Sequence, residues 1–165
     1  MNQPPDKQTL RDDQLLAAAS RFDAKGVAEA LALGANADAR QALPDGAIGP
    51  TALMRACERP HGEAVECVRL LLEAGADPNA STIGGDTAAL WAAGQRNARG
   101  IELLSLAGAD LNAASRDGRR IEDFSTASGS PDFVAWLASY ALAWRERREL
   151  ARSPPAARAG RGLSL

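Results

Sequence analysis

The side chain of this sequence best suited to general-base catalysis near neutral pH is His61, the single histidine of the chain. It stands beside Pro60 in a segment that is typical of a turn, with no serine or cysteine motif around it. Nucleophilic catalysis needs the base beside the nucleophile, and a metal site needs several ligands at set spacings. No second Cys or His lies at such a spacing from His61. The sequence therefore predicts no catalytic base and no metal site.

Other chemistry-bearing patterns are equally incomplete. Neither Gly84-Gly85 nor the segment 46–49 follows the glycine and lysine pattern of a phosphate-binding loop. The paired carboxylates Asp12-Asp13 and Glu122-Asp123 stand at predicted helix starts, where the helix dipole favours negative charge. Helix capping explains them more simply than acid–base work. We therefore expect no enzyme activity and no cofactor.

The two cysteines, Cys57 and Cys67, fall inside predicted helices with Ala- and Val-rich surroundings. This favours buried, reduced thiols of a cytoplasmic protein over a disulfide or a redox pair. No apolar run approaches the length that a membrane span requires, and residues 1–7 have no apolar signal-peptide region. The sequence thus predicts a cytoplasmic protein without membrane contact.

A repeat in the sequence predicts the helices and loops on which any functional residue would lie. Segments 33–39, 74–80 and 107–113 have nearly the same sequence, and their glycines lie 41 and 33 residues apart. A recurrence near this length indicates a stacked array, in which each unit buries its apolar face against its neighbours. Hydrophobic residues make up 45% of the chain and aromatic residues only 4%, which favours slim, closely stacked helices.

Each unit is predicted to be a helical pair. Thr51 and Thr87 each precede a short Ala-rich helix, where a hydroxyl can cap the first amides. A second helix follows, with apolar residues at helical spacing. It ends at Gly34, Gly75 or Gly108, where a left-handed residue is needed.

These motifs resemble the ankyrin-repeat family. The family's Thr-Pro-Leu-His-x-Ala-Ala box is present in altered form at 51–57 and 87–93, where both copies lack its Pro and His. The family's Val-x-x-Leu-Leu-x-x-Gly-Ala-Asp-x-Asn-Ala ending is nearly complete at 68–80 and recognisable at 101–113. The resemblance implies an all-α solenoid of about four helix-turn-helix units with hairpin loops. The expected units are 9–40, 47–80, 83–113 and 116–145.

The regions outside the units differ in composition. Residues 1–8 are expected to be a flexible N-terminus, and residues 146–165 a disordered basic tail rich in Pro, Gly, Ala and Arg. The formal net charge is -2, but six arginines follow position 144, so the remaining body is acidic. The acidic body argues against a nucleic-acid-binding fold, while the basic tail either is a solvated segment or contacts nucleic acid or acidic lipid. The Ala-, Arg- and Gly-rich usage is typical of a GC-rich bacterial genome.

The resemblance implies a non-catalytic protein–protein interaction module that binds its partner through a concave face and hairpin loops. Arg55 and Trp91 occupy equivalent places on successive first helices, as interface anchors or, for Trp91, as a filler beside small alanines. The expected partner-contact residues are Ile48, Pro50, Arg55, Glu58, Arg59, Ile83, Asp86, Trp91, Gln95, Arg116 and Arg119.

Three features leave alternatives open. The insertions at 40–50 and 58–62 either contact a partner or are neutral surface variation. Trp136, Tyr140 and Trp144 form a line on the terminal helix that either covers the core or supports self-association of an otherwise monomeric protein. The binding module itself is either a cytosolic inhibitor, such as an immunity protein blocking one enzyme or toxin, or a scaffold or effector with several partners.

Overall fold

The computed structural model describes residues 6–44, 46–127 and 131–152. Within this part of the chain the helices and strands are α1 (Lys7–Arg21), α2 (Ala24–Ala32), β1 (Arg40–Ala42), β2 (Ile48–Thr51), α3 (Ala52–Ala56), α4 (Glu63–Glu73), α5 (Ala88–Gly94), α6 (Ala98–Leu106), α7 (Ile121–Ala127) and α8 (Pro131–Arg152).

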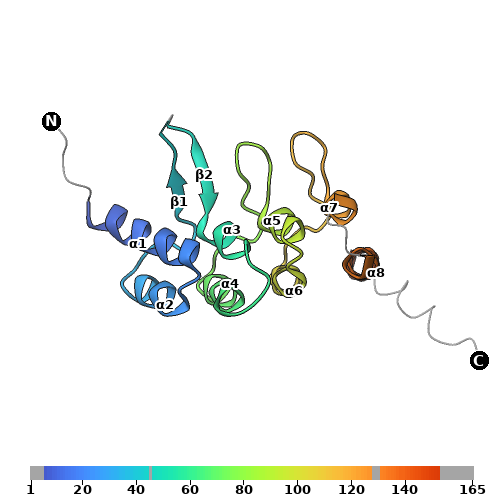
Figure 1. The fold of residues 1–165 in the computed structure, drawn as a ribbon, viewed down its shortest axis with the longest axis horizontal. Helices are drawn as coiled ribbons and strands as arrows, with labels where there is room; N and C mark the ends of the chain where they lie inside the picture. Colours follow the sequence, from blue (N-terminus) through green and yellow to red (C-terminus); the bar gives the residue numbers. More distant parts are fainter. Residues whose placement is uncertain (1–5, 45, 128–130, 153–165) are drawn as a thin grey trace, which may run out of the picture.

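Consecutive helices form pairs that stack side by side into an elongated array (Figure 1). The first helices α1, α3, α5 and α7 make one row, in which each contacts the next. The second helices α2, α4, α6 and α8 make the other row. The loops between units project from the first row, and the loop between α2 and α3 forms the antiparallel β1–β2 hairpin. The predicted all-α solenoid is confirmed.

The predicted helix caps are present. The hydroxyl of Thr51 accepts a hydrogen bond from the Met54 N–H at 3.2 Å, and that of Thr87 from the Leu90 N–H at 3.4 Å. Gly34, Gly75 and Gly108 have φ values of 89°, 88° and 92° just after α2, α4 and α6. Only glycine adopts this conformation without steric cost, which fixes where each second helix ends.

The core is thin and runs the length of the array. Small residues of the first helices, such as Ala56 and Ala92, are fully buried and allow close approach of neighbouring units. Larger aliphatic residues of the second helices, including Leu71 and Leu104, fill the space between the two rows. Each unit therefore buries its apolar surface against its neighbours, as stacking requires.

The loops that follow the second helices are joined by a continuous series of hydrogen bonds, which we call the Asx ladder. Within each loop the first Asx side chain accepts the N–H two residues further on, at 2.8–3.0 Å. The side chain of the second Asx residue accepts a hydrogen bond from the backbone N–H of the first Asx residue in the next loop, at 2.7 Å. The ladder residues are Asn36, Asp38, Asp77, Asn79, Asp110 and Asn112.

Both ends of the Asx ladder are tied to helices. Asp12 in α1 accepts the N–H of Asn36 at 2.8 Å, and Arg145 in α8 donates to Asn112 at 2.6 Å. The ladder thus links the first helix to the last through the loops that follow α2, α4 and α6. Arg145 also pairs with Glu122 in α7, and so holds α8 against the rest of the array.

The terminal helices are longer than expected. Helix α1 begins at Lys7 rather than 9, because the Asp6 side chain caps it by accepting the Thr9 N–H at 2.7 Å. Helix α8 continues to Arg152 rather than ending at 145. Its last part is held by an ion pair of Arg148 with Asp110 at 3.4 Å. The remaining residues of the expected flexible ends, 1–5 and 153–165, lie outside the described residues.

Candidate functional site

We use the term hairpin face for the surface made by α1, α3, α5, α7 and the loops 40–50, 81–87 and 114–120. Arg55, Trp91 and Phe124 lie at equivalent places on it, because each is the fourth residue of its helix. Phe124 was not among the expected residues. Its position follows from the sequence once Arg120 is aligned with Thr51 and Thr87, because α7 begins at Ile121.

A pocket of about 290 Å³ opens between Trp91 and Phe124. Leu90, only 2% exposed, belongs to its apolar lining, while both aromatic rings are half-buried and pack against the core. The pocket unites four of the expected residues with three others. Its lining is Asp86, Leu90, Trp91, Gly94, Gln95, Arg119 and Phe124.

Two arginines flank the aromatic rings. The Arg55 guanidinium lies 5.6 Å from the Trp91 ring centre, and that of Arg119 lies 5.4 Å from the Phe124 ring centre. Arg55 donates to Glu58 at 2.7 Å and to Gln41 at 2.5 Å. These bonds fix Arg55 in place, and the stacking geometry is that of cation–π pairs.

Arg119 is held in a similar way by carboxylates of its own and the preceding loop. It donates to Asp117 at 2.6 Å and lies 3.7 Å from Asp86. Bonds from Ser115 and Arg119 hold the pKa of Asp117 below its usual range. The charge of Arg119 is therefore already balanced on the wall of the pocket.

Gly94 keeps the pocket open. It is exposed, it is the last residue of α5, and a Cβ built on it would lie 3.4 Å from the Phe124 ring. Glycine is among the weakest helix formers, so its presence here costs stability while it leaves space beside Phe124.

Gly94→Ala is accordingly expected to raise the free energy of unfolding by about 0.5–1 kcal/mol, because it favours the helix and fits against Phe124. Urea denaturation followed by circular dichroism measures the change. Gly100→Ala in α6 is the matched control and should destabilise, since its Cβ would lie 2.8 Å from the buried Asn97 amide. A loss of stability in Gly94→Ala would contradict the expectation.

The other expected contact residues differ in their exposure and in their place on the array. Ile48 and Ile83 are 56% and 51% exposed in the loops, and Arg116 is exposed in the third loop. Pro50, by contrast, is buried in β2, so its side chain does not offer a contact surface. Glu58 is on the hairpin face through its bond to Arg55.

Arg59 lies elsewhere. Its guanidinium is 4.6 Å from the Phe22 ring centre, at the turn between α1 and α2. It lines a hollow on that side together with His61 and Glu63. Although Arg59 and Gln95 were both expected to contact the partner, Arg59 does not line the pocket that contains Gln95. It lies at the lengthened turn 58–62 and packs on Phe22 of the first unit.

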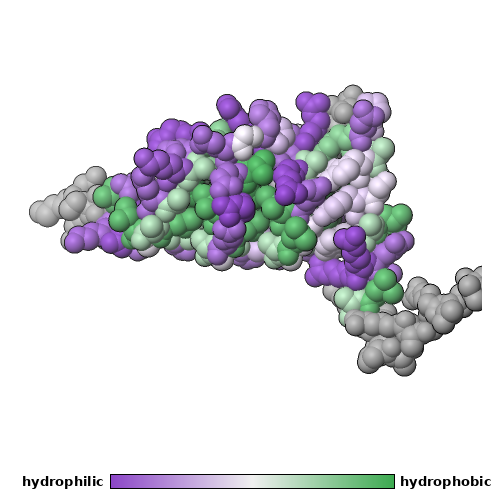
Figure 2. Space-filling model, turned by 90° about the horizontal axis from the view of Figure 1, so that it is seen from below, coloured by the Kyte–Doolittle hydropathy of each residue, from purple (hydrophilic) through white to green (hydrophobic). Residues whose placement is uncertain are grey.

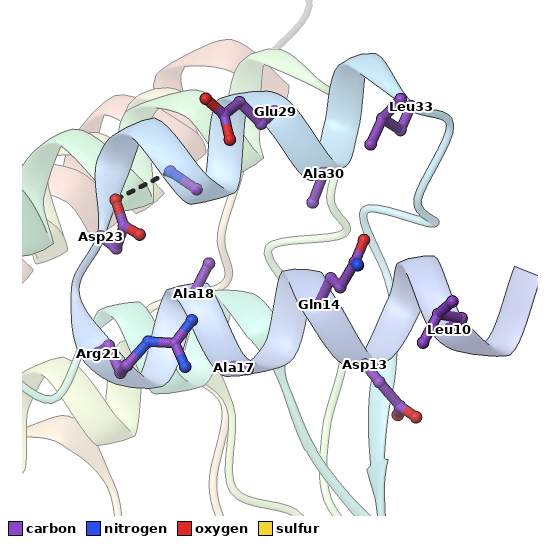
Figure 3. A pocket seen from close by; sticks show the side chains of 11 residues that line it. Leu10, Asp13, Gln14, Ala17, Ala18, Arg21, Asp23, Glu29, Ala30 and Leu33 are labelled. Carbon is purple, nitrogen blue, oxygen red and sulfur yellow. Dashed lines mark hydrogen bonds between the residues drawn. The ribbon is translucent and has the colours of Figure 1, made fainter.

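A larger pocket, of about 530 Å³, lies at the N-terminal end of the array between α1 and α2 (Figure 3). Gln14 and Glu29 line it. The equivalent residues of the second unit are Ala52, which is fully buried, and Leu70, which is partly buried and packs against the core. The polar replacements are those of a unit whose outer face meets water, so this hollow is the end face of a capping unit.

The opposite side of the array is formed by the second helices. Figure 2 shows apolar side chains of the second helices interrupted by polar ones. Arg69 pairs with Glu66 and Glu73 within α4, and Arg99 pairs with Glu102 within α6. Such exposed pairs within one helix contribute little and mark an ordinary solvated surface.

The aromatic line of α8 faces the array. Trp136, Tyr140 and Trp144 are half-buried against the core, and Trp136 stacks on Tyr140 at 5.1 Å. The Tyr140 hydroxyl shares a hydrogen bond of 2.5 Å with Ser105 in α6. These contacts favour the alternative in which the aromatic line covers the end of the core.

Both thiols are buried, and burial raises the pKa of Cys57 to about 12 and that of Cys67 to about 11. We expect neither to react with an aromatic disulfide reagent at about pH 8, except at the rate at which the chain opens. The measurement is thiol release followed by absorbance, with urea-unfolded protein as the fully reactive control. Prompt reaction of either thiol in the folded protein would refute this expectation.

The same thiols make stability depend on pH. The folded pKa values lie above the usual 9.0, so this contribution is complete below about pH 9 and is lost as the pH rises through 11 and 12.

Two further searches of the described residues concern membranes and metals. No helix there combines the length and apolar character needed to cross a bilayer. Nor does that part of the chain contain three or more His, Cys, Asp or Glu placed to hold a metal ion.

Comparison with known proteins agrees with the geometry. No curated protein matches the chain. A family model described as ankyrin repeats, in three copies, matches residues 15–115, which span α1 to α6 and the loop beyond. The fourth pair, α7 and α8, follows this match and stacks on it. Ankyrin repeats are protein–protein interaction modules, and by this match over more than half its length the chain belongs to the ankyrin-repeat family.

Proposed function

We propose that this protein is a non-catalytic module of the cytoplasm that binds a protein partner through its hairpin face. The observation that carries the proposal is the pocket between Trp91 and Phe124, with Arg55 and Arg119 stacked on its rings. Trp and Arg are the residue types that most often dominate binding energy when they lie in a well-packed patch.

The hairpin face is held in shape before any partner arrives. Arg40 in β1 donates to the Ser81 carbonyl at 2.9 Å, and the Arg116 N–H donates to the Gly84 carbonyl at 2.8 Å. Adjacent loops are thereby connected to one another. A preformed surface avoids the entropic cost of ordering loops on binding, which favours a specific, single-partner contact.

The experiment is affinity capture from the native host with tagged protein, followed by calorimetry with the partner. The test variant combines Arg55→Ala, Asp86→Ala and Trp91→Ala. The matched control combines Arg69→Ala and Arg99→Ala on the opposite side. Circular dichroism verifies that both variants are folded.

We expect the partner to be lost by the test variant and retained by the control. Retention by the test variant, or loss only when Trp136 and Tyr140 are changed, would overturn the proposal and move the site to α8. One partner bound one-to-one with a Kd of about 1 nM would identify an inhibitor, whereas several partners at about 1 μM would identify a scaffold.

A further inference from the structure

We infer that the pocket between Trp91 and Phe124 receives one large apolar side chain from an acidic segment of the partner protein, whose carboxylates meet Arg116 and Arg120. This inference rests on the proposed function and specifies the chemistry of the partner. It follows from the size of the pocket, from its neutral wall and from two arginines on the loop of Arg119 whose guanidinium groups pair with no carboxylate in the described part of the chain.

The size and lining of the pocket suit a single side chain. Its volume of about 290 Å³ is below the usual range of small-molecule sites. Leu90 and the Trp91 and Phe124 rings supply apolar surface, and the wall charges of Asp86 and Arg119 balance one another. An aromatic or large aliphatic side chain fits this environment better than a charged one, because burying an unpaired charge is costly.

Gly94 supports this assignment independently. The equivalent position of the second unit holds Glu58, whose side chain bonds to Arg55. A side chain at Gly94 would instead begin 3.4 Å from Phe124 and occupy the pocket. The array therefore leaves a space at a position where alanine would stabilise the helix, and this space is what a partner's side chain fills.

The positive charge beside the pocket indicates which residues should flank the partner's apolar side chain. Arg116 and Arg120 are exposed on the same loop as Arg119, and no ion pair joins either guanidinium to a carboxylate of the described residues. From Arg120, the Asp123 carboxylate accepts only the backbone N–H, at 2.7 Å. Arg119 is already paired with Asp86 and Asp117. The loop 115–120 carries three arginines against one aspartate, so it attracts carboxylates although the chain as a whole is acidic.

The test uses fluorescein-labelled synthetic peptides and the full chain, with binding measured by anisotropy. One peptide has a central Phe flanked by Glu residues, the second has the same Phe flanked by Lys, and the third has Ala in place of Phe. We expect the Glu-flanked Phe peptide to bind at least about tenfold more tightly than the other two, with an affinity that falls as salt is added.

Two variants separate the parts of the inference. Arg116→Glu with Arg120→Glu changes only exposed side chains, and it should reverse the preference toward the Lys-flanked peptide. Gly94→Leu fills the pocket and should weaken the Glu-flanked peptide at least about tenfold, with Gly94→Ala intermediate. Lys25→Glu with Arg99→Glu, which changes exposed cations in α2 and α6, should leave binding unchanged.

Equal binding of the Glu- and Lys-flanked peptides, or unchanged binding by Gly94→Leu, would overturn the inference. Absence of binding by the Glu-flanked peptide up to about 1 mM would also overturn it. A captured partner that is lost by the Arg55, Asp86 and Trp91 variant but docks through a basic segment would overturn this inference alone. A partner retained by that variant would overturn the proposed function as well.

Discussion

Asn97→Asp is expected to destabilise the array more than Asn97→Ala, by about 3–5 kcal/mol against about 2–3 kcal/mol. Asn97 is fully buried and precedes α6. Its side-chain oxygen accepts the Gly100 N–H at 2.7 Å, which caps the helix. Its amide donates to the Cys57 and Arg59 carbonyls at 3.3 and 2.7 Å, which joins α6 to the preceding unit.

The order of the two variants is the informative result. An introduced carboxylate keeps the cap but places a charged oxygen against two carbonyl oxygens, whereas alanine loses the cap and leaves the carbonyls unpaired. If Asn97 acted only as a cap, Asn97→Asp would be nearly neutral. Urea denaturation gives both values, and Asp23→Asn, at the equivalent cap of α2, is the control that should change stability by less than about 0.5 kcal/mol.

The pH dependence of Asn97→Asp provides a second check. Burial beside carbonyl oxygens raises the folded pKa of the new carboxyl group above its unfolded value. The protonated form can donate a hydrogen bond, so the deficit relative to the natural protein should shrink below the unfolded pKa and grow as the pH rises. A deficit that does not vary with pH would contradict this explanation.

Gly85→Ala is expected to lower the free energy of unfolding by about 2–3 kcal/mol. Gly85 has a φ of 78°, which disfavours any Cβ. A Cβ at this position would also lie 3.0 Å from the Arg116 backbone nitrogen and 3.2 Å from the Ser115 Cα. Backbone atoms cannot turn aside as a flexible side chain can, so the second and third loops would have to separate.

Substitutions at two other glycines separate the cost of the positive φ from the cost of the close approach between loops. Gly108 has a φ of 92° and open space around it, so Gly108→Ala should cost only the conformational part, about 1 kcal/mol. A Cβ on Gly84 would meet mainly the movable Asp86 side chain at 3.1 Å, so Gly84→Ala should cost less than about 1 kcal/mol. Equal losses for Gly85→Ala and Gly108→Ala in urea denaturation would show that the close approach of the loops is unimportant.

Features that depend on local sequence could be predicted without the structure. The caps at Thr51 and Thr87 and the helix ends at Gly34 and Gly75 are set by one residue type at one position. The equivalent positions of Arg55 and Trp91 on successive first helices could be predicted because the units repeat in register. Phe124 was missed, although the same register places it in that row.

Features that depend on contacts between units could not be predicted in this way. The amide of Asn97 bonds to the carbonyls of Cys57, at the end of α3, and of Arg59, in the lengthened turn, and the sequence of that turn does not indicate its path. The same turn places Arg59 against Phe22 instead of beside Gln95. Helix α8 extends past 145 because Arg145 and Arg148 find acidic or amide partners about one unit earlier in the chain.

The Asx ladder determines where this chain tolerates changes of length. Its side chains bond both along their own loop and to the next loop, so an added residue between Asp77 and Asn79 would disconnect two neighbours at once. The two insertions lie instead at 40–50 and 58–62, away from the Asx ladder, and account for the longer spacing between Gly34 and Gly75. An epitope or reporter placed at the tip of the β1–β2 hairpin or beside Gly62 should therefore leave the array assembled, whereas the same sequence placed within 76–80 should split it into two blocks that melt separately.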